Sequence, residues 1–317
     1  MPKTAIVTGC AGFIGSHLCE ALVDKGWQVT GIDCFLDNYS RGIKEKNLSS
    51  LLDCPDFVLV GEDLTKVRLE PYLREADTIF HLASQPGVRG SWGKRFDTYI
   101  ANNVLATQRL LEAAKGCDIK KFVYASSSSV YGNNNILPMS EHHLPKPFSP
   151  YGVTKMAAEN LCHLYHENYN VPVISLRYFT VYGPRQRPDM AISNFISSIA
   201  SGRPITIYGD GNQKRDFTYV DDIVQANILA AGSTVAGEVF NVGRGQPVRL
   251  IEVINMIERI LGEKACLEFI SVQRGDVKDT FADITKINRM LGFNPSVELE
   301  AGLASQIEYF LDKNCAL

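Results

Sequence analysis

The chain reads Thr8-Gly9-Cys10-Ala11-Gly12-Phe13-Ile14-Gly15 near its start, and this stretch decides the fold. It follows the apolar residues 5–7 and opens an apolar pattern with helical spacing. Glycines at every third position are typical of a buried strand that turns sharply into a helix. The first permits the turn, the second lets a pyrophosphate approach the backbone, and the third lets the helix pack closely on the strand. The free N–H groups at the start of that helix hold the phosphates. The residues predicted to bind a dinucleotide are Gly9, Gly12, Phe13, Ile14 and Gly15.

A second apolar run ends at Asp33, and this position indicates which dinucleotide is bound. The aspartate follows the last glycine by about 20 residues, as the dinucleotide fingerprint requires. A carboxylate at this position accepts hydrogen bonds from the adenosine ribose hydroxyls and repels a 2′-phosphate. The sequence therefore predicts NAD, rather than NADP, as the cofactor.

Apolar runs alternate with helical patterns through the first half of the chain. Strands are expected over 3–8, 27–33, 57–61, 77–82, 120–126 and 171–178, and long helices over 93–116 and 150–169. This alternation predicts an α/β protein with a Rossmann-type, doubly wound parallel sheet. Ligands of such sheets bind outside the carboxyl ends of the strands.

The regular alternation of strands and helices ends after Thr180. Short strands are expected over 205–208, 215–219 and 238–242, and helices over 190–202, 221–231, 249–261 and 299–312. We expect residues 1–180 to form an NAD-binding domain to which 221–245 returns. Residues 181–220 and 246–317 are expected to form a smaller C-terminal α/β lobe that binds the substrate.

The composition argues against several classes of function. Of the 317 residues, 45% are hydrophobic and 21% are charged, and the net charge is −3. These ordinary values favour neither nucleic acid nor a membrane as a partner. No apolar run approaches the roughly 18 residues that a bilayer-spanning helix needs, and a strand starting at residue 3 leaves no room for a signal peptide. The eight cysteines are scattered without a C-x-x-C pair. We therefore expect reduced thiols, a cytoplasmic location and no metal site.

Tyr151 and Lys155 are the candidate catalytic pair, four residues apart and hence on one face of the expected helix 150–169. An ammonium beside a phenol favours the phenolate. Lowering a phenol pKa from about 10 to about 7 requires roughly 4 kcal/mol. Ser127 follows the expected strand 120–126, where its hydroxyl can bridge a substrate oxygen and the phenol. A Tyr-x-x-x-Lys spacing alone is common, but beside the dinucleotide signature it predicts a site that transfers a proton and a hydride.

Over essentially its whole length the chain resembles the extended short-chain dehydrogenases/reductases of the nucleotide-sugar epimerase, dehydratase and decarboxylase group. The motifs that carry the resemblance are the glycine stretch, Asp63-Leu64, His81-Leu82-Ala83, Asn103, the Ser127 region, Tyr151 with Lys155, Arg177-Tyr178-Phe179 and Arg215-Asp216-Phe217-Thr218-Tyr219-Val220-Asp221-Asp222. The resemblance implies that Tyr151 is the base, Ser127 the catalytic hydroxyl and Lys155 a ligand of the nicotinamide ribose. The further cofactor contacts that it implies are Asp63, Leu64, Leu82, Ala83, Asn103, Ser126 and Tyr178.

The same resemblance implies a UDP-sugar as the substrate. Arg215 and Arg274 would grip the diphosphate, and Asp276 would bind the uridine ribose. Arginine is well suited to phosphate recognition. The further substrate contacts that we expect are Arg89, Arg185, Arg187 and Tyr208. The family also implies a homodimer through the helices 93–116 and 150–169.

The residues after Ser127 indicate the reaction. Ser128-Ser129 stands where related dehydratases carry an Asp-Glu pair, and Ser129 stands where related UDP-glucuronate decarboxylases carry glutamate. The acid and base of those reactions are therefore missing. The resemblance then implies a 4-epimerase: C4 is oxidised by hydride transfer to NAD⁺, the 4-keto sugar turns, and hydride returns to the other face.

Two stretches, 86–93 and 177–190, resemble those of UDP-glucuronate 4-epimerases, which interconvert UDP-glucuronate and UDP-galacturonate. A uronate oxidised at C4 is a β-keto acid that loses CO2 unless its carboxylate is restrained. Ser127, Ser128 and Thr180 are expected to restrain it by hydrogen bonds, with Arg187 closing over the pocket. Three alternatives stay open: a decarboxylase that forms UDP-xylose, a UDP-glucose 4-epimerase, and an NAD-binding protein without turnover.

Overall fold

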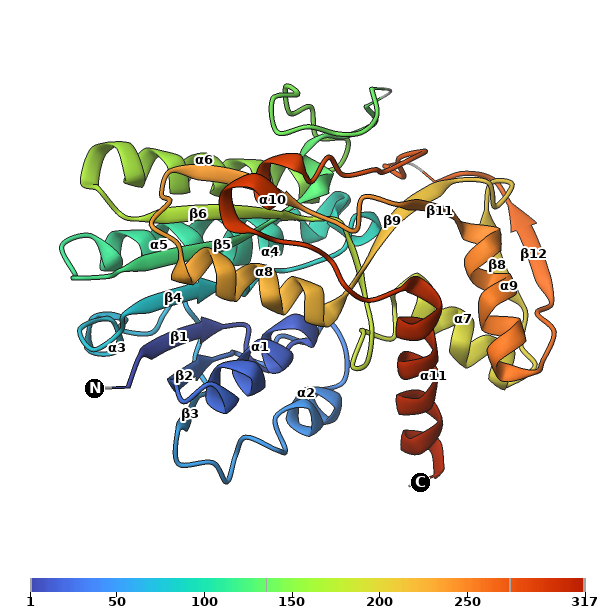
Figure 1. Ribbon diagram of the computed structural model, residues 1–317, viewed down its shortest axis with the longest axis horizontal. Helices are drawn as coiled ribbons and strands as arrows, with labels where there is room; N and C mark the ends of the chain where they lie inside the picture. The colour runs from blue at the N-terminus through green and yellow to red at the C-terminus, as the bar shows by residue number, and fades with distance from the viewer. Residues whose placement is uncertain (1, 135, 274, 316–317) are drawn as a thin grey trace.

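A seven-stranded parallel sheet forms the centre of the larger lobe (Figure 1). The structure is a computed structural model, and it describes residues 2–134, 136–273 and 275–315. The strands of the sheet are β1 (Thr4–Thr8), β2 (Gln28–Ile32), β3 (Phe57–Val60), β4 (Thr78–His81), β5 (Lys121–Ser127), β6 (Val173–Tyr178) and β10 (Glu238–Val242). Their order, β10-β6-β5-β4-β1-β2-β3, confirms the predicted doubly wound α/β fold.

The position of the ligand crevice follows from this order. The chain runs from β1 to β2 and β3, and then returns to β4 on the other side of β1. The carboxyl ends of β1 and β4 therefore border the crevice in which open α/β sheets bind their ligands. Every residue of β5 and β6 is buried, as expected for strands with helices on both faces.

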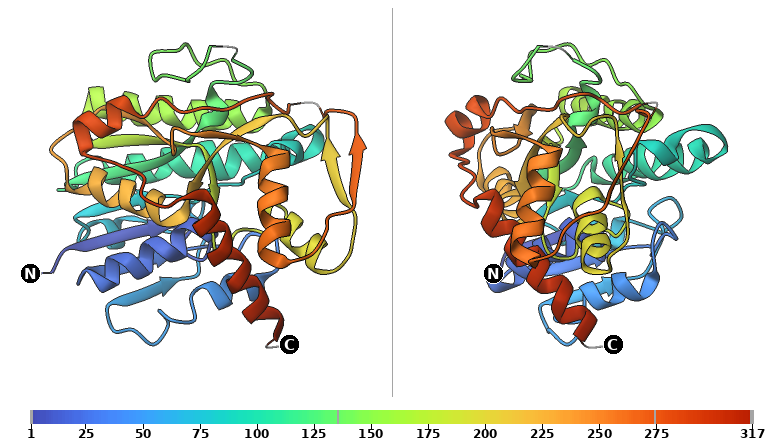
Figure 2. Two further views of the ribbon diagram at one scale, coloured as in Figure 1. Left: turned by 45° about the vertical axis from the view of Figure 1, so that its right-hand side comes forward. Right: turned by 90° about the vertical axis from the view of Figure 1, so that its right-hand side faces the viewer.

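Helices cover both faces of the sheet (Figures 1 and 2). On one face α1 (Phe13–Asp24) packs against α8 (Val220–Gly232), and on the other α5 (Ala106–Ala114) packs against α6 (Pro150–Tyr169). The shorter α2 (Arg41–Asn47) and α3 (Glu70–Leu73) follow β2 and β3. The apolar core beneath α1 and α8 continues into the smaller lobe, so buried apolar surface joins the two lobes. Within the described residues, no helix is both long and apolar enough to cross a bilayer.

The helical stretch expected over 93–116 is confirmed, but it is not one regular α-helix. Short 3₁₀ turns over Arg89–Ser91 and Gly93–Arg95 lead into α4 (Phe96–Tyr99), a π-helix over Ile100–Leu105 and then α5. In the π-helix Asn103 is buried. Its side-chain oxygen accepts the N–H of Gln85, and its side-chain nitrogen donates to the carbonyl oxygen of Gln85 and to Thr154 Oγ1, at 2.7–3.1 Å. Apolar spacing cannot reveal this wider turn, because the turn is set by a polar side chain that finds its partners on other elements.

The smaller lobe contains two short sheets. One has the order β11-β9-β7, and the other pairs β12 with β8. The strands are β7 (Thr180–Tyr182), β8 (Ile205–Tyr208), β9 (Lys214–Tyr219), β11 (Pro247–Arg249) and β12 (Leu267–Ile270). The helices α7 (Ala191–Ala200), α9 (Leu250–Leu261) and α11 (Leu299–Cys315) pack against one another beside them (Figure 2).

One segment of the expected C-terminal lobe lies elsewhere. The helix α10 (Thr285–Leu291) packs against β10 of the central sheet, not against the small lobe. Two contacts lead it there: Met139 exchanges backbone hydrogen bonds with Phe281 and Asp283, and Lys286 Nζ donates to Val239 O at 2.8 Å. Residues 285–291, which we expected in the C-terminal lobe, therefore pack on the central sheet.

Asp216, in the motif 215–222, ties the lobes together. Its fully buried carboxylate accepts the backbone N–H groups of Arg244, Gly245 and Ala282 at 2.8–3.0 Å. Burial raises the pKa of this carboxyl, and the three N–H groups oppose the rise. The aspartate thus joins β9 to the turn after β10 and to the segment leading into α10.

A buried ion pair fastens α6 to the sheet. Arg177 of β6 donates two hydrogen bonds to Glu159 of α6, at 2.6 and 3.0 Å, and a third to Tyr131 Oη at 2.8 Å. The side chains of the pair are only 6% and 8% exposed. Ser126 Oγ also donates to Glu159, at 2.6 Å. The arginine of the 177–179 motif therefore serves to hold the helix in place.

We predict that Glu159→Ala destabilises the protein by about 3–5 kcal/mol, because Arg177 would keep a buried charge without its partner. Urea unfolding of the cofactor-free protein measures this loss. Arg259→Ala is the matched control: it breaks a pair with Glu300 in which both side chains are more than half exposed, and such pairs contribute about 0–1 kcal/mol. Equal losses in the two variants would contradict the prediction.

Candidate active site

A crevice of about 210 Å³ lies at the carboxyl ends of β1, β2, β4, β5 and β6. Its lining contains every predicted cofactor residue except Asn103. These residues are Gly9, Gly12, Phe13, Ile14, Gly15, Asp33, Asp63, Leu64, Leu82, Ala83, Ser126, Tyr151, Lys155 and Tyr178. Asn103 does not line the crevice, because its amide is engaged by Gln85 and Thr154. The structure therefore corrects that assignment: Asn103 supports the crevice from behind.

The glycine stretch has the shape of a phosphate cradle. Gly9 has φ +73°, and a Cβ there would lie 2.8 Å from Ala83 N. A Cβ at Gly15 would overlap the carbonyl oxygen of Gly9. Gly12 precedes α1, and no side chain caps this helix, so the first N–H groups of α1 are available to an anion in the crevice. The cradle thus fits a pyrophosphate.

Asp33 is held in place at the end of β2. Its carboxylate accepts the N–H groups of Ala11 at 3.1 Å and of Phe35 at 2.8 Å. Burial raises the pKa of this carboxyl, while the Phe35 N–H and the ammonium of Lys44 oppose the rise. Lys44 and Tyr39 line the same crevice, and sequence reasoning missed both. They lie on the loop after β2 and on α2, whose path the sequence pattern does not reveal.

The predicted catalytic residues meet where β5 ends and α6 begins. Ser149 caps α6 by accepting the N–H of Gly152 at 3.1 Å, and Pro150 occupies the first turn. The Ser127 hydroxyl lies close enough to the Tyr151 phenol to oppose the rise in its pKa. Ser127 Oγ also accepts the N–H of Ser129 at 3.1 Å. The hydroxyl proton of Ser127 therefore remains free to point toward the phenol or toward a substrate oxygen.

The charges around the phenol differ from the expected arrangement. Burial raises the pKa of Tyr151, and the Ser127 hydroxyl and the Arg187 guanidinium partly oppose this rise. Lys155 instead donates its hydrogen bond to the carbonyl of Ala125 at 2.8 Å, and burial lowers its pKa to about 8. That Lys155 acidifies the phenol stays a prediction, and the positive charge that opposes the rise in the pKa of Tyr151 in this structure is that of Arg187.

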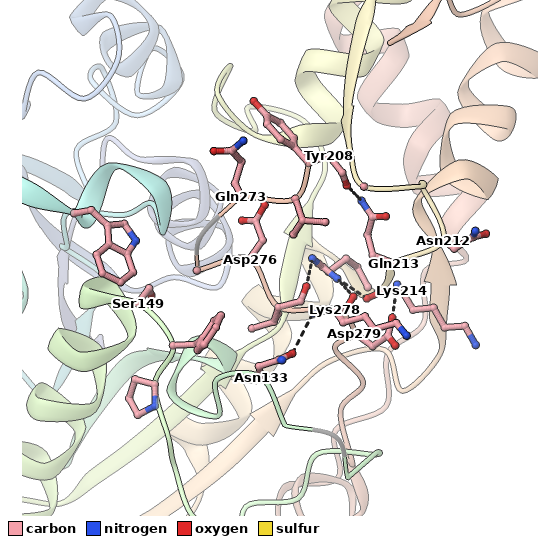
Figure 3. Close-up of a pocket in the computed structure, with 18 of the residues that line it drawn as sticks. Asn133, Ser149, Tyr208, Asn212, Gln213, Lys214, Gln273, Asp276, Lys278 and Asp279 are labelled. Atoms are coloured by element: carbon pink, nitrogen blue, oxygen red, sulfur yellow. Dashed lines mark hydrogen bonds between the residues drawn. The ribbon is translucent and has the colours of Figure 1, made fainter. Parts of the chain in front are cut away.

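A second, larger pocket of about 1650 Å³ opens between the lobes (Figure 3). Tyr208, Arg215 and Asp276, which we assigned to the substrate from the sequence, line it. Arg89 reaches its edge from the loop after β4. The Arg89 guanidinium pairs with Asp276 at 2.8 Å and lies 3.7 Å from the centre of the Tyr208 ring. The Arg215 guanidinium donates to the backbone carbonyls of Lys214, Val277 and Lys278 at 2.7–2.8 Å.

The remaining substrate residues other than Arg185 fall into three groups. Ser127, Ser128 and Thr180 line neither pocket: they lie at the end of β5, just after it and at the start of β7. Arg187 lines the dinucleotide crevice and forms two hydrogen bonds with Asp189, at 2.9 and 3.0 Å. Arg274 lies outside the described residues.

The structure does not bring Arg185 to either pocket. Its guanidinium pairs with Glu20 at 2.8 Å and bonds to Ser16 Oγ at 3.2 Å, both on α1. It lines a separate cavity of about 410 Å³ beside α7 and α11. The physical reason is the ion pair with Glu20, which holds the guanidinium on α1. Arg185 is therefore removed from the candidate substrate contacts.

Phe148 and Gln273 also line the larger pocket, and sequence reasoning missed them. They come from loops with no periodic pattern, so only the tertiary structure reveals them. In the described part of the chain, His, Cys, Asp and Glu side chains form no group of three or more suited to a metal ion.

Comparison with known proteins places this geometry in a family. The model of the NAD dependent epimerase/dehydratase family matches residues 5–243. The "uncharacterized UDP-glucose epimerase YtcB" of Bacillus subtilis is 45% identical over 306 residues, with 96% of each chain covered. The UDP-glucuronate 4-epimerase of Thermodesulfobacterium geofontis is 38% identical over 310 residues, or 96% of this chain and 95% of the relative. The crystal structure of UDP-glucuronic acid 4-epimerase from Bacillus cereus, with UDP-glucuronic acid and NAD, is 44% identical, with a TM-score of 0.95 over 98% of this chain and 99% of that one. With a family match over most of its length, the chain belongs to the NAD dependent epimerase/dehydratase family.

Proposed function

We propose that this chain is an NAD-dependent UDP-glucuronate 4-epimerase, which interconverts UDP-glucuronate and UDP-galacturonate. The observation that carries the proposal is the position of Tyr151, which lines the dinucleotide crevice with the hydroxyl of Ser127 beside its phenol. Relatives named UDP-glucuronate 4-epimerase, and the Bacillus cereus enzyme with its bound UDP-glucuronic acid, support this substrate.

The crevice fits NAD. The cradle of Gly9, Gly12 and Gly15 receives the pyrophosphate, and the oriented carboxylate of Asp33 receives the ribose hydroxyls. When bound, NAD supplies the acceptor that takes a hydride from C4 of the sugar and later returns it. Lys155, at the base of the crevice, is proposed to bind the nicotinamide ribose.

Tyr151 is the proposed general base and acid. Its Oη takes the proton of the C4 hydroxyl as the alcohol becomes a ketone, and returns that proton in the second half of the reaction. Ser127 is proposed to orient the exchange, because its hydroxyl lies beside the phenol of Tyr151 and is itself positioned by the N–H of Ser129. The positive charge of Arg187 favours the phenolate that this cycle requires.

The chain's own residues account for the choice of reaction. Positions 128 and 129 carry hydroxyls, so no carboxyl group beside Ser127 is available for dehydration. We assign restraint of the substrate carboxylate to Ser127, Ser128 and Thr180. The register of the sheet brings them together, because Ser127 pairs with Tyr178, two residues before Thr180. We assign the UDP moiety to the larger pocket, with Arg215, Asp276 and Tyr208 as contacts.

The substrate is tested by incubating the protein with UDP-glucuronate and following the products by NMR. UDP-galacturonate is the expected product, without loss of CO2. Formation of UDP-xylose would instead identify a decarboxylase. Inertness toward UDP-glucuronate with turnover of UDP-glucose would identify a neutral-hexose epimerase, the activity suggested by the name of the Bacillus subtilis relative.

We predict that Tyr151→Phe lowers kcat by about 10²–10⁴-fold, the contribution typical of a general acid–base group. Bound NAD should remain, because the aromatic ring still lines the crevice. Kinetics and extraction of the bound nucleotide measure the two effects. Tyr169→Phe, a half-exposed tyrosine at the other end of α6, is the control and should keep full activity. A Tyr151→Phe variant with near-normal turnover would refute the assignment.

We further propose that the chain forms a homodimer and resides in the cytoplasm. Large apolar side chains on the outer faces of the π-helix and α6 are nearly half exposed, among them Leu105 at 45% and Leu164 at 50%. Such side chains mark a surface suited to a protein partner. The seven described cysteine side chains are free thiols, which supports a reducing compartment.

The dimer is tested by sedimentation. The protein should sediment at about twice its chain mass of 35.1 kDa, whereas Leu105→Asp with Leu164→Asp should give monomers, because a charge in an apolar interface is costly. Leu52→Asp changes a leucine of similar exposure outside this surface and should leave the mass unchanged. A wild-type protein that sediments as a monomer would disprove the proposal.

A further inference from the structure

Tyr99 lies directly behind the proposed catalytic base. It is the last residue of α4, just before the π-helix, and only 2% of it is exposed. Its ring meets the ring of Tyr151 nearly edge to face, with the ring centres 6.3 Å apart and the planes at 74°. Such pairs have a preferred geometry. The ring of Tyr99 therefore restricts how the phenol of Tyr151 can turn.

The hydroxyl of Tyr99 holds the loop over residues 86–92. Tyr99 Oη lies 3.0 Å from the carbonyl oxygen of Pro86 and 2.9 Å from that of Gly87, and it donates its single proton to this pair of acceptors. The loop passes close around the hydroxyl: a Cβ at Gly87 would lie 3.5 Å from it, and a Cβ at Gly90 3.2 Å. The hydroxyl of Tyr99 is therefore an anchor of this loop.

The same loop borders the pocket between the lobes, which Trp92 lines. It carries Arg89, which pairs with Asp276 and lies over the ring of Tyr208. It also contacts the small lobe at Gly275, where a Cβ would lie 3.2 Å from Trp92 Nε1. A group that displaces or engages Arg89 in this pocket thus acts on the loop that Tyr99 holds.

We propose that Tyr99 is a positioning residue that couples the nucleotide pocket to the base. Its hydroxyl sets the loop 86–92 that contacts the UDP moiety, and its ring sets the orientation of Tyr151. This inference rests on the function proposed above for Tyr151. A small misplacement of a reacting group costs a large factor in rate, so the ring should affect kcat, whereas the hydroxyl should affect binding.

Two substitutions separate the hydroxyl from the ring. Tyr99→Phe keeps the ring and loses the hydrogen bonds to the loop, so UDP, measured by calorimetry with the NAD-loaded protein, should bind about fivefold more weakly. Its kcat at saturating substrate should stay within about twofold of the wild type, because the ring packing is kept. Tyr99→Met fills the space with a flexible side chain. It should weaken UDP binding to the same extent and also lower kcat by about tenfold or more.

A matched control excludes a general effect of losing a buried hydroxyl. Tyr165 is also buried, and its Oη donates to Glu112 at 2.6 Å, between α5 and α6. Tyr165→Phe should therefore leave UDP binding unchanged. The NAD content and melting temperature of every variant show whether the fold is intact.

The proposal is overturned if Tyr99→Phe binds UDP as tightly as the wild type, or if Tyr99→Met has the same kcat as Tyr99→Phe. Phenylalanine fits the space of tyrosine, so Tyr99→Phe is expected to fold. If Tyr99→Met does not fold, the UDP affinity of Tyr99→Phe by itself decides the proposal. The binding arm needs no turnover. Inertness toward UDP-glucuronate would therefore count against the proposed substrate, and unchanged UDP binding in Tyr99→Phe would count against the coupling.

Discussion

The buried pair of Arg177 and Glu159 is the interaction on which the site depends. Glu159 lies on α6, one helical turn beyond Lys155. Its carboxylate accepts hydrogen bonds from Arg177 of β6 and from Ser126 of β5. It therefore holds the helix that carries Tyr151 against the strand ends that carry Ser127. Two charges in the interior are costly unless each finds its full set of partners. Here those partners also fix the alignment of phenol and hydroxyl.

The electrostatics of the base come from both lobes. Burial by itself makes the phenol of Tyr151 a weaker acid, which opposes its role as a base at neutral pH. Arg187, which follows β7 of the small lobe, opposes this effect, whereas Lys155, on the same helix as Tyr151, donates to the carbonyl of Ala125. The base is therefore sensitive to how the small lobe sits over the crevice. This links substrate binding between the lobes to proton transfer in the crevice.

The irregular stretch before α5 supports the same alignment from the rear. Tyr99 and Asn103 lie four residues apart, at the end of α4 and within the π-helix, and both hold residues of the segment that follows β4. Asn103 also bonds to Thr154, beside Lys155 on α6. Departures from regular helix geometry often mark functional sites. Here the departure turns two polar side chains of one helical segment toward the loop and the catalytic helix.

The sequence alone determined the features that depend on local chemistry. The spaced glycines, the aspartate after the second strand and the alternation of elements predicted the parallel sheet and nearly all of the cofactor crevice, because each reflects a short-range requirement for a turn, a helix start or a buried strand. The pair of Tyr151 and Lys155 was found in the same way, from the spacing of one helical turn.

Only the tertiary structure decided which partners the long polar side chains choose. Arg185 turned to Glu20 on α1, Asn103 to Gln85, and α10 returned to the central sheet. Likewise, the charge of Arg187, from beyond β7, opposes the rise in the pKa of the phenol. A side chain of several rotatable bonds can reach many partners. Which one it binds depends on elements brought together from distant parts of the chain, and no local pattern encodes that choice.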